Sequence, residues 1–255
     1  MHQFMIQDIE IKSLPVGIVT DSHTDLTNLE KLKSQYSQLI CLGDFTSTKK
    51  IMGHDNDISV TAFRESGIPC LRGNHEEFIR KVKTGTWPLP FAYSLSRENR
   101  KFIASLPIGF RLLLPNGDKL LCFHNRPNEV GGASKNPWDV LDLIRDYPID
   151  CHTTAVLTGH THTSLIRGYK ELDVKFVRCA SLQDGGYAEI DENGKVRLKH
   201  LFNSLSYEVW WKNYCDKADS EAIRQQQYGE PEFGYPDLGD FPYYDEKEGR
   251  LILPC

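Results

Sequence analysis

The chain alternates short apolar runs, each about as long as a buried strand, with segments of helical periodicity. Near the N-terminus the strand-like runs are Pro15–Thr20, Gln38–Leu42 and Ile68–Leu71, and the helical segments between them are Leu26–Tyr36 and Ile58–Ser66. A strand–helix–strand–helix–strand order is typical of a mainly parallel sheet with right-handed crossovers. This alternation restricts the chain to an α/β architecture more strongly than any other feature of the sequence.

The pattern changes after a helix that is predicted over Ser96–Leu106 and ends before Pro107. Two strands are predicted next, Phe110–Leu114 and Lys119–Phe123, joined by the turn Pro115-Asn116-Gly117-Asp118. They are followed by a predicted helix over Trp138–Tyr147 and a buried strand over Thr154–Thr158. Antiparallel hairpins are predicted within residues 165–202. The sequence therefore predicts a second, more antiparallel sheet beside the first.

Carboxylate, amide and imidazole side chains follow five of the predicted strands. The segments after these strands are Asp21-Ser22-His23, Gly43-Asp44, Gly73-Asn74-His75, His124 and Gly159-His160-Thr161-His162. Open α/β sheets bind ligands at the carboxyl ends of their strands. The three glycines are expected to adopt the positive φ of tight turns. We therefore expect these side chains to meet at one edge of the molecule.

Seven of these side chains suit a divalent metal ion: Asp21, His23, Asp44, Asn74, His124, His160 and His162. All of them offer nitrogen or oxygen and none offers a thiolate, which favours manganese, iron, zinc or magnesium over a structural zinc site. Seven donors are more than one closed tetrahedral site needs. A pair of bridged metal ions about 3.5–4 Å apart is the natural arrangement for them.

The five motifs, in this order, resemble those of the calcineurin-like metallophosphoesterase superfamily over about residues 15–182. The segment Ser96–Pro107, the hairpin after it and the run Phe123-His124-Asn125-Arg126-Pro127 resemble the smaller, phosphodiesterase-like branch. The resemblance implies a four-layer α/β/β/α sandwich built on two mixed sheets. It also implies that one metal ion is held by Asp21, His23, Asp44 and His162. The other metal ion would be held by Asn74, His124, His160 and again Asp44, which bridges the two ions.

The reaction implied by this resemblance is hydrolysis of a phosphate ester of a small molecule or a nucleotide. A metal-bridging hydroxide attacks phosphorus in line, and His75 is the candidate general acid. Asn74 and Arg126 are the predicted contacts to the phosphate. Two departures from the family pattern are Asn125 in place of glycine and Cys179-Ala180-Ser181 in place of Asn-Pro-Gly-Ser, a region to which we assign no function.

Two alternative functions remain open at this point. One is hydrolysis of a nucleotide or dinucleoside polyphosphate, which uses the same chemistry on a different substrate. The other belongs to a different class: a non-catalytic scaffold for protein–protein contact, as in the retromer subunit of this superfamily. The intact ligand set and His75 favour an enzyme. The sequence contains neither a Walker A motif nor G-x-G-x-x-G, so a kinase or a dehydrogenase has no support.

The composition favours a reduced, cytoplasmic protein without a membrane or nucleic-acid partner. No apolar run is long enough to cross a bilayer, and the first residues lack the basic start of a secretory signal. The cysteines are odd in number and form no C-x-x-C pair, and Cys41, Cys122 and Cys179 lie in apolar runs typical of buried thiols. The net charge is −5, which gives no sign of affinity for polyanions.

The negative charge is concentrated at the C-terminal end. Residues 203–255 contain eleven acidic and five basic residues, whereas residues 1–202 contain 24 and 25. The same C-terminal segment holds ten of the 27 aromatic residues, too many for a disordered acidic tail. We expect a catalytic domain over residues 1–202 and an acidic, aromatic extension over residues 203–255 that packs on it. A partner-binding surface and an active-site lid are the alternatives for this extension. The sequence predicts no oligomeric state.

Overall fold

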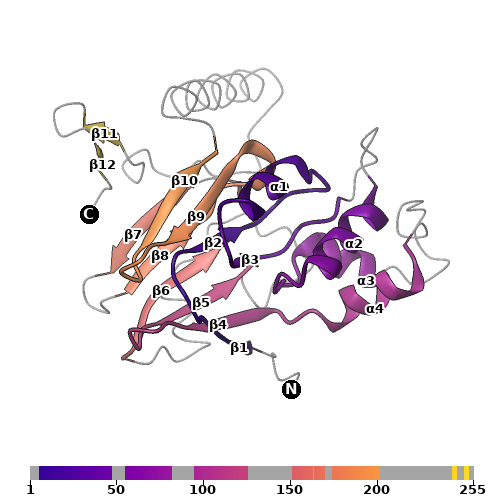
Figure 1. The fold of residues 1–255 in the computed structure, drawn as a ribbon, viewed down its shortest axis with the longest axis horizontal. Helices are drawn as coiled ribbons and strands as arrows, with labels where there is room; N and C mark the ends of the chain where they lie inside the picture. Colours follow the sequence, from indigo (N-terminus) through magenta and orange to yellow (C-terminus); the bar gives the residue numbers. More distant parts are fainter. Residues whose placement is uncertain are drawn as a thin grey trace, which may run out of the picture.

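A computed structural model describes residues 6–47, 55–81, 95–125, 151–162, 164–169, 174–201, 243–245 and 250–252 (Figure 1). The helices in these residues are α1 (Thr27–Lys33), α2 (Asn56–Ser66), α3 (Asn74–Lys81), α4 (Arg97–Ser105) and the 3-10 helix η3 (Leu182–Asp184). The strands are β1 (Ile6–Glu10), β2 (Val16–Val19), β3 (Leu39–Cys41), β4 (Gly109–Leu113), β5 (Lys119–Phe123), β6 (Thr153–Thr158), β7 (Leu165–Tyr169), β8 (Val174–Arg178), β9 (Gly186–Ile190), β10 (Val196–His200), β11 (Tyr243–Asp245) and β12 (Arg250–Ile252).

Two mixed sheets form the centre of the fold. The six-stranded sheet has the order β1-β4-β5-β6-β8-β7, and the four-stranded sheet has the order β10-β9-β2-β3. In the first sheet β5, β6 and β8 are parallel neighbours, and β4 and β7 run antiparallel to their partners β5 and β8. In the second, β2 and β3 are parallel and are joined through α1, as the alternating pattern predicts. The predicted α/β class with two mixed sheets is confirmed.

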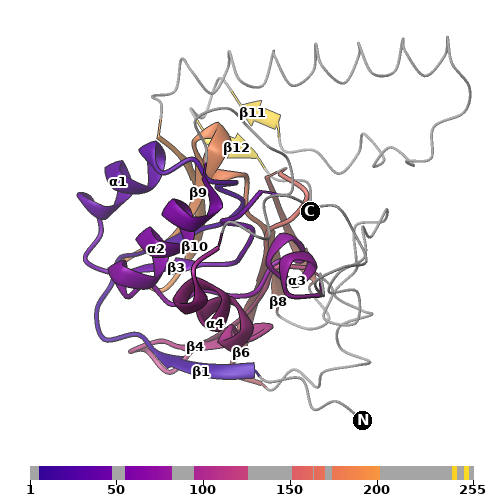
Figure 2. The ribbon, with the colours of Figure 1, turned by 90° about the vertical axis from the view of Figure 1, so that its right-hand side faces the viewer.

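Two hydrophobic cores hold the layers together. The first lies between the facing sides of the sheets and includes Ile18, Ile40 and Leu157. The second includes Val19 and Phe63 and fills the space between the four-stranded sheet and α1, α2 and α4 (Figure 2). Ile18 and Val19 enter different cores because successive side chains of a strand point to opposite faces of the sheet. Strands buried on both faces therefore read as continuous apolar runs.

The outer face of the six-stranded sheet is also apolar. Leu121, Phe123, Val156 and Phe176 alternate with residues of the central core, and all four are buried. A sheet with two apolar faces needs a covering layer on each, as in the predicted four-layer sandwich. The helix predicted over Trp138–Tyr147 lies outside the described residues.

The structure corrects the prediction at three places. The segment Ile68–Leu71 is not a strand and forms one parallel bridge, between Cys41 and Cys70, because Pro69 has no N–H to donate to a longer ladder. Strand β1 and helix α3 are absent from the predicted elements. The hairpins within residues 165–202 divide between the sheets, since β7 and β8 join the larger sheet and β9 and β10 the smaller.

Most of the C-terminal extension lies outside the described residues. Its two short strands, β11 and β12, pair antiparallel with each other. Packing of the extension on the catalytic domain stays a prediction. In the described part of the chain, every helix is too short or too polar to span a bilayer.

Candidate active site

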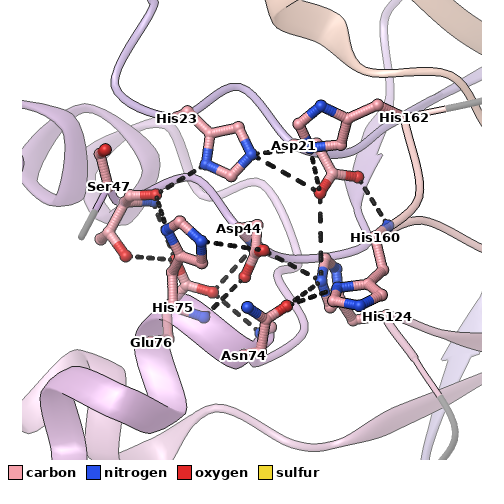
Figure 3. Close-up of polar contacts among 12 residues, drawn as sticks. Asp21, His23, Asp44, Ser47, Asn74, His75, Glu76, His124, His160 and His162 are labelled. Carbon is pink, nitrogen blue, oxygen red and sulfur yellow. Dashed lines mark hydrogen bonds and ion pairs between the residues drawn. The ribbon is translucent and has the colours of Figure 1, made fainter. Parts of the chain in front are cut away.

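The seven predicted metal-binding side chains converge at the carboxyl ends of the strands of both sheets (Figure 3). Three groups of three have donor atoms that all lie within 4.8 Å of one another. Asp21, His23 and His162 form the first group, Asp44, His124 and His160 form the second, and His23, Asp44 and His75 form the third. The first and second groups each combine residues from the N-terminal and the C-terminal halves of the domain. The Asn74 side chain lies beside the second group and contacts His124 and His160.

The Asp21 carboxylate has one satisfied oxygen and one unsatisfied oxygen. Oδ2 accepts hydrogen bonds from Thr20 Oγ1 at 2.7 Å and from the His160 main-chain N–H at 2.9 Å. Oδ1 is buried and has no hydrogen-bond partner of good geometry, although His162 Nε2 is 3.4 Å from it and His23 Nε2 is 3.8 Å away. A buried, unpaired carboxylate oxygen facing imidazole nitrogens fits a divalent cation, which would satisfy all of them together.

The second group is built around the Asp44 carboxylate and the Asn74 amide. His124 Nε2 lies 3.1 Å from Asp44 Oδ2 and 2.9 Å from Asn74 Oδ1. His160 Nδ1 lies 2.7 Å from the same Asn74 oxygen. The other Asp44 oxygen, Oδ1, accepts the His75 main-chain N–H at 2.9 Å, which holds the carboxylate in place. This donor set of carboxylate, amide oxygen and imidazole suits manganese, iron, zinc or magnesium.

Main-chain carbonyl groups orient two of the imidazole rings. His124 Nδ1 lies 3.0 Å from the carbonyl oxygen of Leu42, and His23 Nδ1 lies 3.2 Å from that of Thr46. A carbonyl oxygen only accepts, so Nδ1 carries a proton in both rings and Nε2 is the nitrogen that can bind a cation.

The charges of the two groups shift each other's pKa values strongly. Burial alone would raise the pKa of Asp21, but the charges of His124, His162 and His23 outweigh burial and hold that pKa far below the ordinary 3.8. Burial would lower the pKa of His124, but the carboxylates of Asp44 and Asp21 raise it to about 10. Burial lowers the pKa of His23 and His160. Without a cation, the single positive charge of protonated His124 offsets part of the negative charge of the two buried carboxylates.

His75 lies at the rim of the site, with a side chain that is one-fifth exposed. Its Nδ1 is 3.2 Å from the carbonyl oxygen of Thr46, and its ring packs against His23 with centroids 4.6 Å apart. Nε2 lies 3.9 Å from Asp44 Oδ2. The Thr46 carbonyl is thus a partner that orients His75 and leaves Nε2 on the side of the first and second groups.

The backbone at the site is strained. Among the described residues, the non-glycine residues with positive φ are Asp21, His23, Thr24, Asp44, His160 and His162. Five of these six are predicted metal ligands. A left-handed conformation costs a residue with a side chain about 1–2 kcal/mol, and such residues cluster at functional sites. The left-handed conformation turns neighbouring side chains toward one point, whereas a regular extended strand would point them to opposite faces.

Two of the three glycines before the ligands serve a different purpose from the one predicted. Of the three, Gly43 alone has the predicted positive φ, of 104°. Gly73 and Gly159 are needed for close packing, because a Cβ at Gly73 would overlap the Asp44 carboxylate and one at Gly159 would overlap the side chains of Thr20 and Asp21. The prediction of positive φ is therefore wrong for these two positions.

Substitution of Gly73 by alanine is expected to destabilise the fold by about 1–3 kcal/mol, because the added methyl group forces the Asp44 loop to move. Thermal unfolding measures the effect. Gly168→Ala is the matched control, since a Cβ there meets no atom within 4 Å. Equal unfolding midpoints for the two variants would contradict the close-packing role.

Two residues that contribute to the site carry no signal in the sequence. Glu76 is fully buried and accepts hydrogen bonds from the main-chain N–H groups of Asp44 and Gly73. Ser181 Oγ donates to the carbonyl oxygen of Asp21 at 2.7 Å, so the segment to which no function was assigned supports a predicted ligand. Asn125 is buried beside His124 in the chain, and Arg126 lies outside the described residues.

Comparisons with known proteins agree with this architecture. A crystal structure of a metallophosphoesterase from Sphaerobacter thermophilus has a TM-score of 0.56 and 17% identity, over 87% of this chain and 96% of that chain. A hypothetical protein from Pyrococcus horikoshii OT3 has a TM-score of 0.54 and 13% identity, over 83% of this chain and 96% of that chain. A protein provisionally assigned as a diadenosine tetraphosphatase has a TM-score of 0.54 and 19% identity, over 78% of this chain and 99% of that chain. At these identities the likeness shows a shared fold. No curated protein matches the sequence.

The family assignment rests on the sequence itself. The family model described as the calcineurin-like phosphoesterase superfamily domain matches residues 14–183, which is about two-thirds of the chain and includes all seven predicted ligands. The chain belongs to the calcineurin-like phosphoesterase superfamily.

Proposed function

We propose that this protein is a hydrolase of phosphate esters that depends on two divalent metal ions. The observation that carries the proposal is the pair of donor groups at one edge of the sheets, in which the buried Asp21 Oδ1 has no hydrogen-bond partner. We assign Asp21, His23, Asp44 and His162 to one metal ion, and Asp44, Asn74, His124 and His160 to the other. Bound there, the cations would lower the pKa of a shared water and neutralise charge on the phosphate.

The protein's own residues supply orientation and a proton. The Leu42 and Thr46 carbonyls set the imidazole tautomers of His124 and His23, so that their Nε2 lone pairs are available. His75 is oriented by the same Thr46 carbonyl, to which its Nδ1–H donates. In its imidazolium form it carries a second proton on Nε2, which it can give to the leaving oxygen of the ester. Asn74 combines a ligand oxygen with an amide N–H₂ group that can donate to a phosphate oxygen. Arg126 is proposed as a further phosphate contact.

Metal analysis paired with a panel of phosphate esters tests this function. The purified protein is expected to bind two manganese ions per chain and to hydrolyse p-nitrophenyl phosphate or bis(p-nitrophenyl) phosphate. The panel includes diadenosine tetraphosphate, because one protein of similar fold carries that provisional assignment. Two bound metal ions without turnover of any ester would favour the non-catalytic scaffold and overturn the proposal.

His75→Asn is expected to lower kcat on phenyl phosphate by about 10²-fold or more, within the usual range for a general acid. The loss on p-nitrophenyl phosphate is expected to be smaller, because p-nitrophenolate leaves more readily without a proton. The ratio of kcat values on the two substrates is the measurement. His152→Asn is the control, since His152 precedes β6 at the end of that strand opposite His160. An unchanged ratio in His75→Asn would exclude His75 as the acid.

A further inference from the structure

One main-chain carbonyl orients two functional histidines. The oxygen of Thr46 lies 3.2 Å from His23 Nδ1 and 3.2 Å from His75 Nδ1. Since the carbonyl can only accept, each ring carries a proton on Nδ1, and both Nε2 atoms point away from Thr46. His75 acts as an acid when its ring carries a second proton, on Nε2. In the proposed function, one of these rings is a metal ligand and the other is the acid. The position of this one peptide group therefore affects the orientation of both rings.

That peptide group is anchored by Glu76. The Thr46 N–H and Oγ1 donate to Glu76 Oε1 at 2.9 and 2.8 Å. The second oxygen, Oε2, accepts the main-chain N–H groups of Asp44 and Gly73, both at 2.8 Å. Thr46 and Glu76 are both fully buried. Hydrogen bonds to a buried carboxylate are about twice as strong as those between neutral groups, so the anchor is rigid.

The anchor joins two of the five motifs. Thr46 follows the ligand Asp44 in the chain, and Glu76 follows the ligand Asn74 at the first turn of α3. Through the four hydrogen bonds of Glu76, a displacement of α3 moves the Thr46 carbonyl, and with it both imidazole rings. The geometry thus couples the first metal position to the second.

We propose that Thr46 and Glu76 are positioning residues that hold His23 and His75 in one shared orientation. The proposal rests on the function proposed above. It goes beyond the ligand set, because neither residue is assigned to a metal ion or to the substrate. It predicts that ligation by His23 and proton donation by His75 weaken together when the anchor is broken.

Two variants break the anchor to different degrees. Glu76→Gln leaves one acceptor oxygen where the carboxylate had two, so the new N–H₂ group faces two of the four donors. Thr46→Val is milder, since it keeps the main chain and the side-chain shape and removes the hydrogen bond from Oγ1. Thr46→Ser keeps that hydroxyl group and is expected to restore wild-type behaviour.

Ser59→Ala is the matched control. Ser59 Oγ is fully buried and donates to the carbonyl oxygen of Phe45 at 2.7 Å, in the same loop as Thr46. Its removal loosens the loop without touching the anchor or either histidine. A general loss of loop stability therefore affects Ser59→Ala and Thr46→Val alike, whereas loss of positioning affects only Thr46→Val.

Three measurements decide the proposal. Proton–nitrogen NMR spectra of the metal-free protein are expected to show Nδ1–H tautomers for His23 and His75 in wild type and broadened signals in Thr46→Val and Glu76→Gln. Manganese affinity is expected to fall about 10–100-fold, the usual effect of losing a group that orients a ligand. The kcat ratio between p-nitrophenyl phosphate and phenyl phosphate is expected to rise in both variants and to stay at the wild-type value in Thr46→Ser and Ser59→Ala.

The outcomes separate this proposal from the proposed function. Folded Thr46→Val protein with wild-type tautomer signals, manganese affinity and substrate ratio would overturn the positioning role, even if Glu76→Gln fails to fold. A wild-type protein without turnover, in which the variants still change the tautomer signals and the manganese affinity, would overturn the phosphoesterase function and support the positioning of His23.

Discussion

Asp44→Asn is expected to lower kcat on phosphate esters by on the order of 10³-fold or more, because the variant loses the one carboxylate proposed to bind both metal ions. The contacts of Asp44 explain how that loss arises. Asp44 Oδ1 is held by the His75 main-chain N–H, so the asparagine oxygen stays at that position. The new N–H₂ group then faces His124 Nε2 in place of Oδ2, and an amide nitrogen does not bind a metal ion.

Metal analysis and kinetics on the same preparation check this result. The variant is expected to retain fewer than two manganese ions per chain along with its loss of turnover. Asp191→Asn is the matched control, since Asp191 is another buried carboxylate but holds Arg197 and the turn between β9 and β10. It is expected to lose stability and keep kcat. Turnover unchanged in Asp44→Asn would exclude the proposed site.

Removal of metal ions by a chelator is expected to abolish turnover and to lower the unfolding temperature. A ligand present at one hundred times its Kd stabilises the native state by about 2.7 kcal/mol. For a domain of this size, that corresponds to roughly 5–10 °C. Thermal unfolding with EDTA, and then with excess manganese, measures the shift. Magnesium-free buffer without chelator is the control. Adding manganese must restore both turnover and the midpoint temperature of unfolding.

The stabilisation by metal is expected to grow as pH rises from 6.5 toward 10. In the metal-free protein the pKa of His124 is raised from 6.5 to about 10, so its stabilising effect is complete below pH 6.5 and is lost as pH rises through 10. A cation must displace that proton, and its affinity therefore increases over the same range. An unfolding shift that is constant or falls between pH 6.5 and 9 would contradict the assignment of His124 as a ligand.

Much of the candidate site could be predicted because its signals are local. Each of the motifs containing Asp21, Asp44 and Asn74 follows an apolar run, and the order of elements places the carboxyl ends of parallel strands on one edge. The helices α1, α2 and α4 were predictable from apolar periodicity and, at the end of α4, from Pro107. None of these inferences needs a contact between distant residues.

Most of the errors share a cause, which is that the deciding contact is distant in the chain. The exception is the segment Ile68–Leu71, where Pro69 lies within the segment itself. Glycine is required at position 159 because the side chains of Thr20 and Asp21, which follow a strand of the other sheet, leave no room for a Cβ. Ser181 supports Asp21 over 160 positions. Helix α3 begins at the ligand Asn74, and its buried Glu76 is fixed by the loop after β3. The residues next to Gly159, Ser181 and Glu76 in the chain therefore give no sign of these roles.

The sequence by itself determined the types of donor, their place at strand ends and the α/β class, because all three follow from residue chemistry and short-range periodicity. Only the tertiary structure decided which donors meet. His23 and His162 are 139 positions apart, yet their Nε2 atoms lie 2.9 Å from each other. That distance depends on how the two sheets stack around a common core. The same packing decided which nitrogen of each ring faces the site, because main-chain carbonyls such as that of Thr46 are present in every sequence and become specific acceptors only when folding places them.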